Sequence, residues 1–142
     1  MATPQIVLDT NVLISAQRSQ RGASSRLLSL LDTGKFETHL SVALVLEYEE
    51  VLMRYRLNLG LSQDDVTDLV DALCALSQLH EIHYQWRPYL RDADDEFVLE
   101  LAVAAGCKYI VSFNQRHFVG VERFGIRVMT PGKFLQIIGE TS

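Results

Sequence analysis

The sequence has little cysteine, little proline and no long apolar run. Its 142 residues include two cysteines, Cys74 and Cys107, both in apolar segments and without a paired C-x-x-C motif. Because no apolar leader opens the chain, this cysteine usage indicates reduced, buried thiols in a cytoplasmic protein. No stretch approaches the roughly 20 apolar residues that span a bilayer, so we expect no membrane association.

Several other features are absent, and each absence excludes a class of protein. A net charge of −5 argues against nucleic-acid binding through a uniformly basic surface. The chain has no Walker loop, GxGxxG or GxSxG motif, so nucleotide hydrolases, dehydrogenases and esterases lack support. Hydrophobic residues make up 48% and charged residues 22%, which is typical of a soluble globular chain. We expect a single domain over residues 1–142.

The first distinctive stretch is a short apolar run that ends on a carboxylate. Ile6 to Leu8 suits a strand buried on both faces, and Asp9, Thr10 and Asn11 follow it directly. In an open parallel sheet, ligands bind in the crevice outside the carboxyl ends of the strands. Asp9 is therefore a candidate site residue. The alternative is that Asp9 or Asn11 only caps the next helix.

Strands and helices alternate along the rest of the chain. Further short strands are expected at 36–40, 80–84, 109–111 and 125–129. Between them, patterns typical of helices cover 12–17, 41–56 and 131–138. Three further helices are expected: one capped by Ser24 or Ser25 that ends near Gly34, one that begins at Ser62, and one that ends at Ala105. This alternation predicts an α/β domain with a central parallel sheet.

Two later carboxylates lie at unusual places in their helices. Glu47 falls on the margin of the apolar face of helix 41–56, although Glu49 lies on the opposite margin and the pattern alone does not separate them. The helix after Asp94 is apolar almost all round, with a narrow polar strip of Glu96 and Glu100. Asp95 lies outside that strip, toward the packed side, where an ionised carboxylate is costly unless it is paired or bound to a metal. The alternative is an acid that stabilises the helix dipole.

Together, these residues predict one kind of chemistry. Asp9, Glu47 and Asp95 would repel one another near one crevice unless a cation neutralised them. Carboxylate oxygens favour Mg²⁺ or Mn²⁺, and such ions lower the pKa of bound water and offset charge on a phosphoryl group. Hydrolysis of a phosphodiester is the reaction we expect.

Several stretches, in order, resemble those of a known family. They are Leu8 to Leu13, Ser41 with Glu47 to Leu52, Asp92 to Phe97 with Leu101 and Ala102, Ile110 to Phe118, and the closing segment Pro131 to Leu135. With them the chain resembles a PIN-domain ribonuclease of the bacterial toxin (VapC-like) type. Each stretch alone is a weak signal, whereas the ordered set is specific.

The resemblance implies a three-layer α/β/α fold and a divalent-metal-dependent endoribonuclease. It also implies an antitoxin partner and a homodimer. In this chain Asp9, Glu47 and Asp95 match the acidic metal ligands. Thr10 and Asn11 match the residues that brace the first ligand, and Ser112 matches the residue that closes the last strand. The fourth acidic position is Asn114, a departure that favours one firmly bound ion over two.

An acidic protein must still bind RNA, and cationic side chains follow or precede the matching stretches. They could form a positive rim for phosphates: Arg18, Arg21, Arg26, Arg91, Arg116 and His117. Arg116 is the best candidate because it adjoins Asn114, and His117 is better read as a structural residue than as a catalytic acid. Two alternatives remain open: a catalytically weak module that binds RNA or an antitoxin, and a phosphohydrolase with a small substrate.

Overall fold

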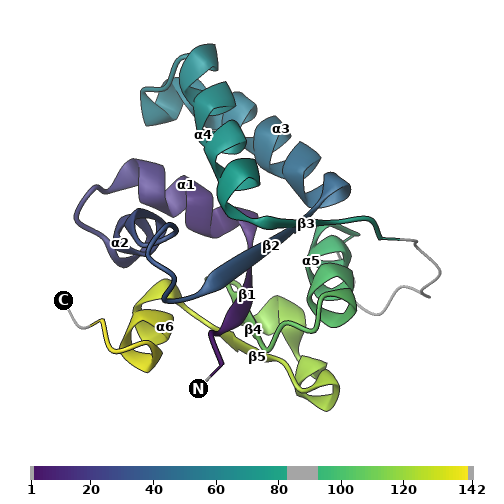
Figure 1. The fold of residues 1–142 in the computed structure, drawn as a ribbon. Coiled ribbons are helices and arrows are strands. Elements are labelled where there is room, and N and C mark those ends of the chain that lie inside the picture. The colour runs from purple at the N-terminus through teal and green to yellow at the C-terminus, as the bar shows by residue number, and fades with distance from the viewer. Residues whose placement is uncertain (1, 83–92, 141–142) are drawn as a thin grey trace.

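A parallel five-stranded sheet forms the centre of the protein (Figure 1). The computed structural model describes residues 2–82 and 93–140, with the side chains of residues 93 and 94 excepted. The strands are β1 (Gln5–Leu8), β2 (Glu37–Ser41), β3 (Gln78–His80), β4 (Tyr109–Val111) and β5 (Arg127–Met129). Their order is β3-β2-β1-β4-β5, and every pair is parallel. The order reverses between β1 and β4, so a crevice is expected there, outside the carboxyl ends of these two strands.

Helices cover both faces of this sheet. They are α1 (Thr10–Arg18), α2 (Ala23–Ser29), α3 (Val42–Leu59), α4 (Gln63–Leu76), α5 (Ala93–Ala104) and α6 (Pro131–Ile137), with short 3₁₀ helices η1 (Gln115–Phe118) and η2 (Val121–Phe124). In Figure 1, α1, α2 and α6 lie on one side of the sheet and α5 lies on the other. Helices α3 and α4 pack together as a hairpin. The predicted three-layer α/β/α architecture is therefore confirmed.

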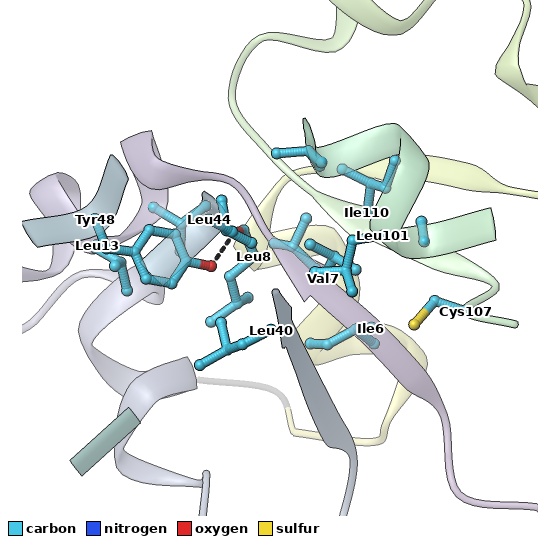
Figure 2. Packing of buried hydrophobic residues seen from close by; sticks show 14 of the residues in the cluster. Ile6, Val7, Leu8, Leu13, Leu40, Leu44, Tyr48, Leu101, Cys107 and Ile110 are labelled. Atoms are coloured by element: carbon cyan, nitrogen blue, oxygen red, sulfur yellow. Dashed lines mark hydrogen bonds between the residues drawn. The ribbon is translucent and has the colours of Figure 1, made fainter. Parts of the chain in front are cut away.

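Alternate residues of the buried strands point to the two helical layers. Figure 2 shows Val7 of β1 close to Leu101 of α5, whereas Leu8 lies on the side of Leu13 and Tyr48. All of these side chains belong to one cluster of buried hydrophobic residues. Burial on both faces explains why β1 reads as an unbroken apolar run in the sequence.

Polar residues set the helix boundaries near the site. The Ser41 side chain accepts a hydrogen bond from Leu44 N–H and so caps α3, as predicted. The helix runs further than expected, to Leu59, and it ends at Gly60, whose φ of +72° suits glycine. Ser62 and Asp65 form a reciprocal capping box at the start of α4.

Three local expectations are wrong. The cap of α2 is Gly22, whose close contact with Ser19 leaves little room for a side chain, whereas Ser24 lies inside the helix. Strand β3 lies at 78–80 rather than 80–84; residues 83 and 84 lie outside the described part. Helix α2 ends at Ser29 rather than near Gly34. Glu96 and Glu100, the narrow polar strip of α5, are both buried. Asp92, where the third matching stretch begins, also lies outside the described residues.

A row of polar side chains crosses β1, β2 and β3 away from the crevice. His39 Nδ1 lies 2.7 Å from Nε2 of His80, and the two rings are stacked. The other His39 nitrogen hydrogen-bonds the Gln5 side chain. Burial and the neighbouring His80 lower the pKa of His39.

Both cysteines are free thiols. Cys107 is buried as predicted, whereas Cys74 is only half-buried. Within residues 2–82 and 93–140, no helix has the length and apolar character needed to cross a membrane.

Candidate active site

The ends of β1 and β4 bring two predicted site residues together at the point where the strand order reverses. Leu8 pairs with Val111 in the sheet, so Asp9 and Ser112 are the next residues on adjacent strands. Asp9 N–H donates to the Val111 carbonyl at 2.9 Å, which extends the strand pairing up to the carboxylate. Both side chains are buried, with exposed fractions of 7% and 0%.

The Asp9 carboxylate accepts hydrogen bonds from three sides. Its Oδ1 accepts from Thr10 N–H at 2.8 Å, so Asp9 is the N-cap of α1. Its Oδ2 accepts from Ser112 Oγ at 2.7 Å and from Asn11 Nδ2 at 3.4 Å. Asp9 is therefore a helix cap and a crevice residue at once, and the two interpretations of the sequence do not exclude each other. Thr10 and Asn11, the residues expected to brace this carboxylate, both donate to it.

The second carboxylate reaches the same place from α3. Thr10 Oγ1 donates to Glu47 Oε2 at 2.5 Å, which links the start of α1 to the middle of α3. Tyr48, the next residue, donates its hydroxyl to the Leu8 carbonyl at the end of β1 (Figure 2). Burial, Asp9 and Glu47 together raise the pKa of Tyr48 well above its ordinary value, so the hydroxyl keeps the proton that it donates.

The third carboxylate comes from the first turn of α5. Asp95 is only 6% exposed, as its position on the packed side of the helix predicted. Its Oδ2 lies 3.0 Å from Nδ1 of His117, which follows β4 in the 3₁₀ helix η1. His117 is thus one partner of this buried carboxylate.

All three carboxylates line one cavity of about 340 Å³ at this edge of the sheet. Polar and charged residues form much of its wall: Asp9, Thr10, Asn11, Arg18, Glu47, Asp95, Asn114 and His117. The apolar wall consists of Ile14, Val51 and Tyr55. Since three anionic side chains face the cavity against one arginine, its lining favours a cation.

The residue types fit a hard divalent cation, although the present side-chain positions are not those of a bound ion. Carboxylate and amide oxygens, the ligands that Mg²⁺ and Mn²⁺ prefer, come from four segments of the chain. Glu47 and Asp95 both have protein partners, Thr10 and His117. Among the side chains that the structure describes, no three Asp, Glu, His or Cys residues are grouped closely enough to bind one ion.

Asn114 and its neighbours form a hydrogen-bonded turn after β4. Asn114 N–H donates to Ser112 Oγ at 2.9 Å, and Phe113 N–H donates to Asn11 Oδ1 at 3.3 Å. Asn11 Nδ2 also donates to Ser112 Oγ at 3.2 Å. Asn11 and Ser112 therefore connect the turn to Asp9 and place Asn114 at the cavity wall.

The predicted rim of arginines is only partly assembled. Arg18 lines the carboxylate cavity, and Arg116 lines a second cavity beside it. The expectation for Arg21 and Arg26 is wrong: they line a separate cavity between α2 and α6, and Arg26 pairs with Glu140 at 2.8 Å. Folding of α2 against α6 carries them there. Arg91 lies outside the described residues.

Sequence reasoning missed two structural roles at this site. Helical spacing places Tyr48 on the apolar face of its helix, and only the fold shows that its hydroxyl donates to the Leu8 carbonyl and so connects α3 to the end of β1. Val51 and Tyr55, one and two turns after Glu47 in α3, line the same cavity as Glu47. The spacing of Glu47, Val51 and Tyr55 by four residues is the signal that could have placed them together.

Comparison with known proteins agrees with this geometry. A family search matches residues 5–116 to the PIN domain, and PIN domains are generally nucleases. A search of curated proteins finds no match. The matched region includes Asp9, Glu47, Asp95 and Asn114, and the parallel sheet with helices on both faces is consistent with a PIN-like fold. Since the match covers well over half of the chain, the protein belongs to the PIN-domain family.

Proposed function

We propose that this protein is an endoribonuclease that needs a divalent metal ion, Mg²⁺ or Mn²⁺, to hydrolyse RNA phosphodiester bonds. The observation that carries the proposal is the single cavity lined by Asp9, Glu47 and Asp95, which come from three different segments of a PIN-domain chain. Three carboxylates facing one cavity repel one another, and a bound cation would relieve this repulsion through its attraction to all three. A phosphodiester substrate adds further negative charge, which the same cation would offset.

Asp9, Glu47 and Asp95 would hold the ion. When bound, such an ion supplies a water of lowered pKa and neutralises charge on the phosphate. The chain fixes Asp9 through Ser112 and Asn11, so this ligand is oriented before the ion arrives. In this proposal, Glu47 and Asp95 exchange their protein partners for the ion. Arg18 supports the proposal because its guanidinium is available to a phosphate at the same cavity.

The alternative is a catalytically weak PIN module that binds RNA or an antitoxin. The observation that favours it is Asn114, which lines the cavity with a neutral amide at the position where the resemblance implies an acid. An amide still orients a ligand or a water through its oxygen, but it adds no charge to hold a second ion. We therefore propose one firmly held ion.

The resemblance to toxin-type PIN ribonucleases leads us to propose a cytoplasmic toxin with an antitoxin partner and a homodimeric state. The mass of the purified protein in solution, measured by light scattering, tests the dimer. An antitoxin-like gene directly beside the coding sequence, and co-purification of its product, test the partner. A monomer that co-purifies with nothing would leave only the nuclease proposal.

The decisive experiment compares the parent protein with three carboxylate variants on a panel of RNAs. Cleavage should stop in EDTA, return with added Mg²⁺ or Mn²⁺, and disappear in Asp9→Asn and Asp95→Asn. Asp68→Asn, on the exposed side of α4, is the matched control and should cleave like the parent. Equal rates in all four proteins would show that the ligand assignment is wrong. Hydrolysis of a small phosphomonoester alone would favour the small-substrate phosphohydrolase.

Asn114→Asp separates the two main readings. If the parent cleaves RNA and the variant cleaves it at a similar rate, the amide is compatible with catalysis. If the parent binds RNA without turnover under every metal and the variant gains activity, the weak binding module is correct.

A further inference from the structure

A second cavity opens beside the carboxylate cavity, over the segment that follows β4. Its volume is about 520 Å³, and residues 113 to 117 line it: Phe113, Asn114, Gln115, Arg116 and His117. Asn114 and His117 also line the carboxylate cavity. The two cavities therefore share part of their walls, so one extended molecule can occupy both.

The ring of Phe113 is exposed while its backbone is fixed. Phe113 has 46% of its surface exposed. Its N–H donates to Asn11 Oδ1, and the next N–H donates to Ser112 Oγ. On the other side, His117 N–H donates to the Asn114 carbonyl at 3.0 Å, and buried Phe118 anchors η1. These three hydrogen bonds hold the turn in place, and the aromatic ring is exposed to solvent on it.

The groups around this ring suit a nucleobase. A base stacks on an aromatic face or on a guanidinium plane, and Phe113 and Arg116 offer both in one cavity. The side-chain amides of Asn114 and Gln115 provide donors and acceptors for the edge of the base. A phosphate at the carboxylates would leave the neighbouring base within reach of this cavity.

We propose that the cavity over residues 113–117 is a nucleobase subsite in which Phe113 is the stacking surface. The proposal rests on RNA being the substrate of the adjoining site. It makes Phe113 a determinant of which nucleotide lies next to the cleaved bond, with the larger ring system of a purine gaining more from stacking than a pyrimidine.

The test measures stacking directly and does not depend on cleavage. A short single-stranded RNA carries the fluorescent adenine analogue 2-aminopurine, whose emission is quenched when it stacks on an aromatic ring. With Ca²⁺ in place of Mg²⁺ to offset the charge of the carboxylates, the parent protein should bind the RNA and quench the probe. Phe113→Ala should bind about tenfold more weakly and lose the quench, and Phe113→Trp should keep both.

Val119→Ala is the matched control, because Val119 is an apolar side chain that is 73% exposed just beyond η1 and lies outside both cavities. It should leave binding and quenching unchanged, and circular dichroism should show that all variants fold. Equal binding and quenching by Phe113→Ala and the parent would overturn the subsite, as would binding without quench in the parent. Equal losses in Phe113→Ala and Val119→Ala would also overturn it.

The same variants separate this inference from the proposed function. Metal-dependent cleavage that requires Asp9 but is unaffected in Phe113→Ala leaves the nuclease and removes the subsite. A quench that requires Phe113 in a protein that cleaves no RNA leaves the subsite and removes the nuclease.

Discussion

Replacing Ser112 by alanine removes the hydroxyl that joins the ends of β1 and β4. Ser112 Oγ donates to Asp9 Oδ2 and accepts from Asn11 Nδ2 and Asn114 N–H. Asn11 and Asn114 have access to solvent, so water replaces the hydrogen bond that each donates to Ser112 Oγ with little loss of free energy. Asp9 is buried, so it loses a charge-assisted hydrogen bond without a good substitute.

The loss at Asp9 dominates the expected change in stability. A hydrogen bond to a charged group contributes about 1.5–3 kcal/mol, and the two solvated bonds add little, so we expect Ser112→Ala to lower the free energy of unfolding by about 2 kcal/mol. For a chain of this size that corresponds to a fall in Tm of about 7 °C. RNA cleavage should also fall, because Asp9 and Asn114 both lose their orientation.

Urea unfolding followed by circular dichroism measures this change. Ser29→Ala is the matched control, since the hydroxyl of Ser29 donates to the Arg26 carbonyl at an exposed position. The control should stay within about 0.5 kcal/mol of the parent. If Ser112→Ala unfolds at the same urea concentration as the control, the hydroxyl does not stabilise the site and the account of Asp9 is refuted.

Three further predictions concern buried titratable groups away from the carboxylate cavity. Burial and Glu96 raise the pKa of Glu100 above its ordinary 4.5, so the free energy of unfolding should fall as pH rises above 4.5, by at most about 1.4 kcal/mol per pH unit. Glu100→Gln should lose this dependence in pH-resolved urea melts, and an unchanged slope would contradict the assignment. Burial and His80 lower the pKa of His39 below 6.5, so the unfolded chain binds this proton more readily than the folded protein. The free energy of unfolding of the parent should therefore fall as the pH drops from 6.5, and that of His39→Gln should not. Parallel plots of the free energy of unfolding against pH for the two proteins would contradict the prediction. Burial raises the pKa of Cys107 to about 12, so at pH 8 only about 10⁻⁴ of this thiol is ionised. In the Cys74→Ser variant, where Cys107 is the remaining thiol, Ellman's reagent should therefore label the protein only after unfolding. Rapid labelling of the native protein would disprove the burial of Cys107.

The fold class follows from the sequence because each buried strand carries its own signal. The run from Ile6 to Leu8 is apolar on both faces, which only a covered parallel sheet requires. The order of the strands carries no comparable signal. Nothing in the residues of β1 says that β4, about a hundred positions later, lies beside it, so the position of the crevice could not be predicted from periodicity.

The site residues differ in how far the sequence could identify them. Asp95 stands out because a carboxylate on the packed side of an apolar helix needs a partner. Glu47 does not stand out from Glu49, since both lie on margins of the same helix. The contact that distinguishes Glu47 is the Thr10 hydroxyl, 37 residues earlier in the chain, and helical spacing carries no information about it.

The errors have a common physical cause. Helical periodicity shows which residues share a face, but it does not show what the rest of the fold places over that face. Periodicity therefore identifies Glu96 and Glu100 as a narrow polar strip, but it does not show that the fold buries them. Arg26 reads as part of a phosphate rim although the packing of α2 on α6 pairs it with Glu140.

The central claim is that the carboxylates around one cavity bind a divalent ion. Titration of Mn²⁺ into the metal-free protein, followed by electron paramagnetic resonance of the free ion, measures this directly. We predict one ion bound per chain and at least about tenfold weaker binding in Asp95→Asn, with Asp68→Asn unchanged. Equal Mn²⁺ affinity in the parent and Asp95→Asn, or no uptake by the parent, would contradict the account.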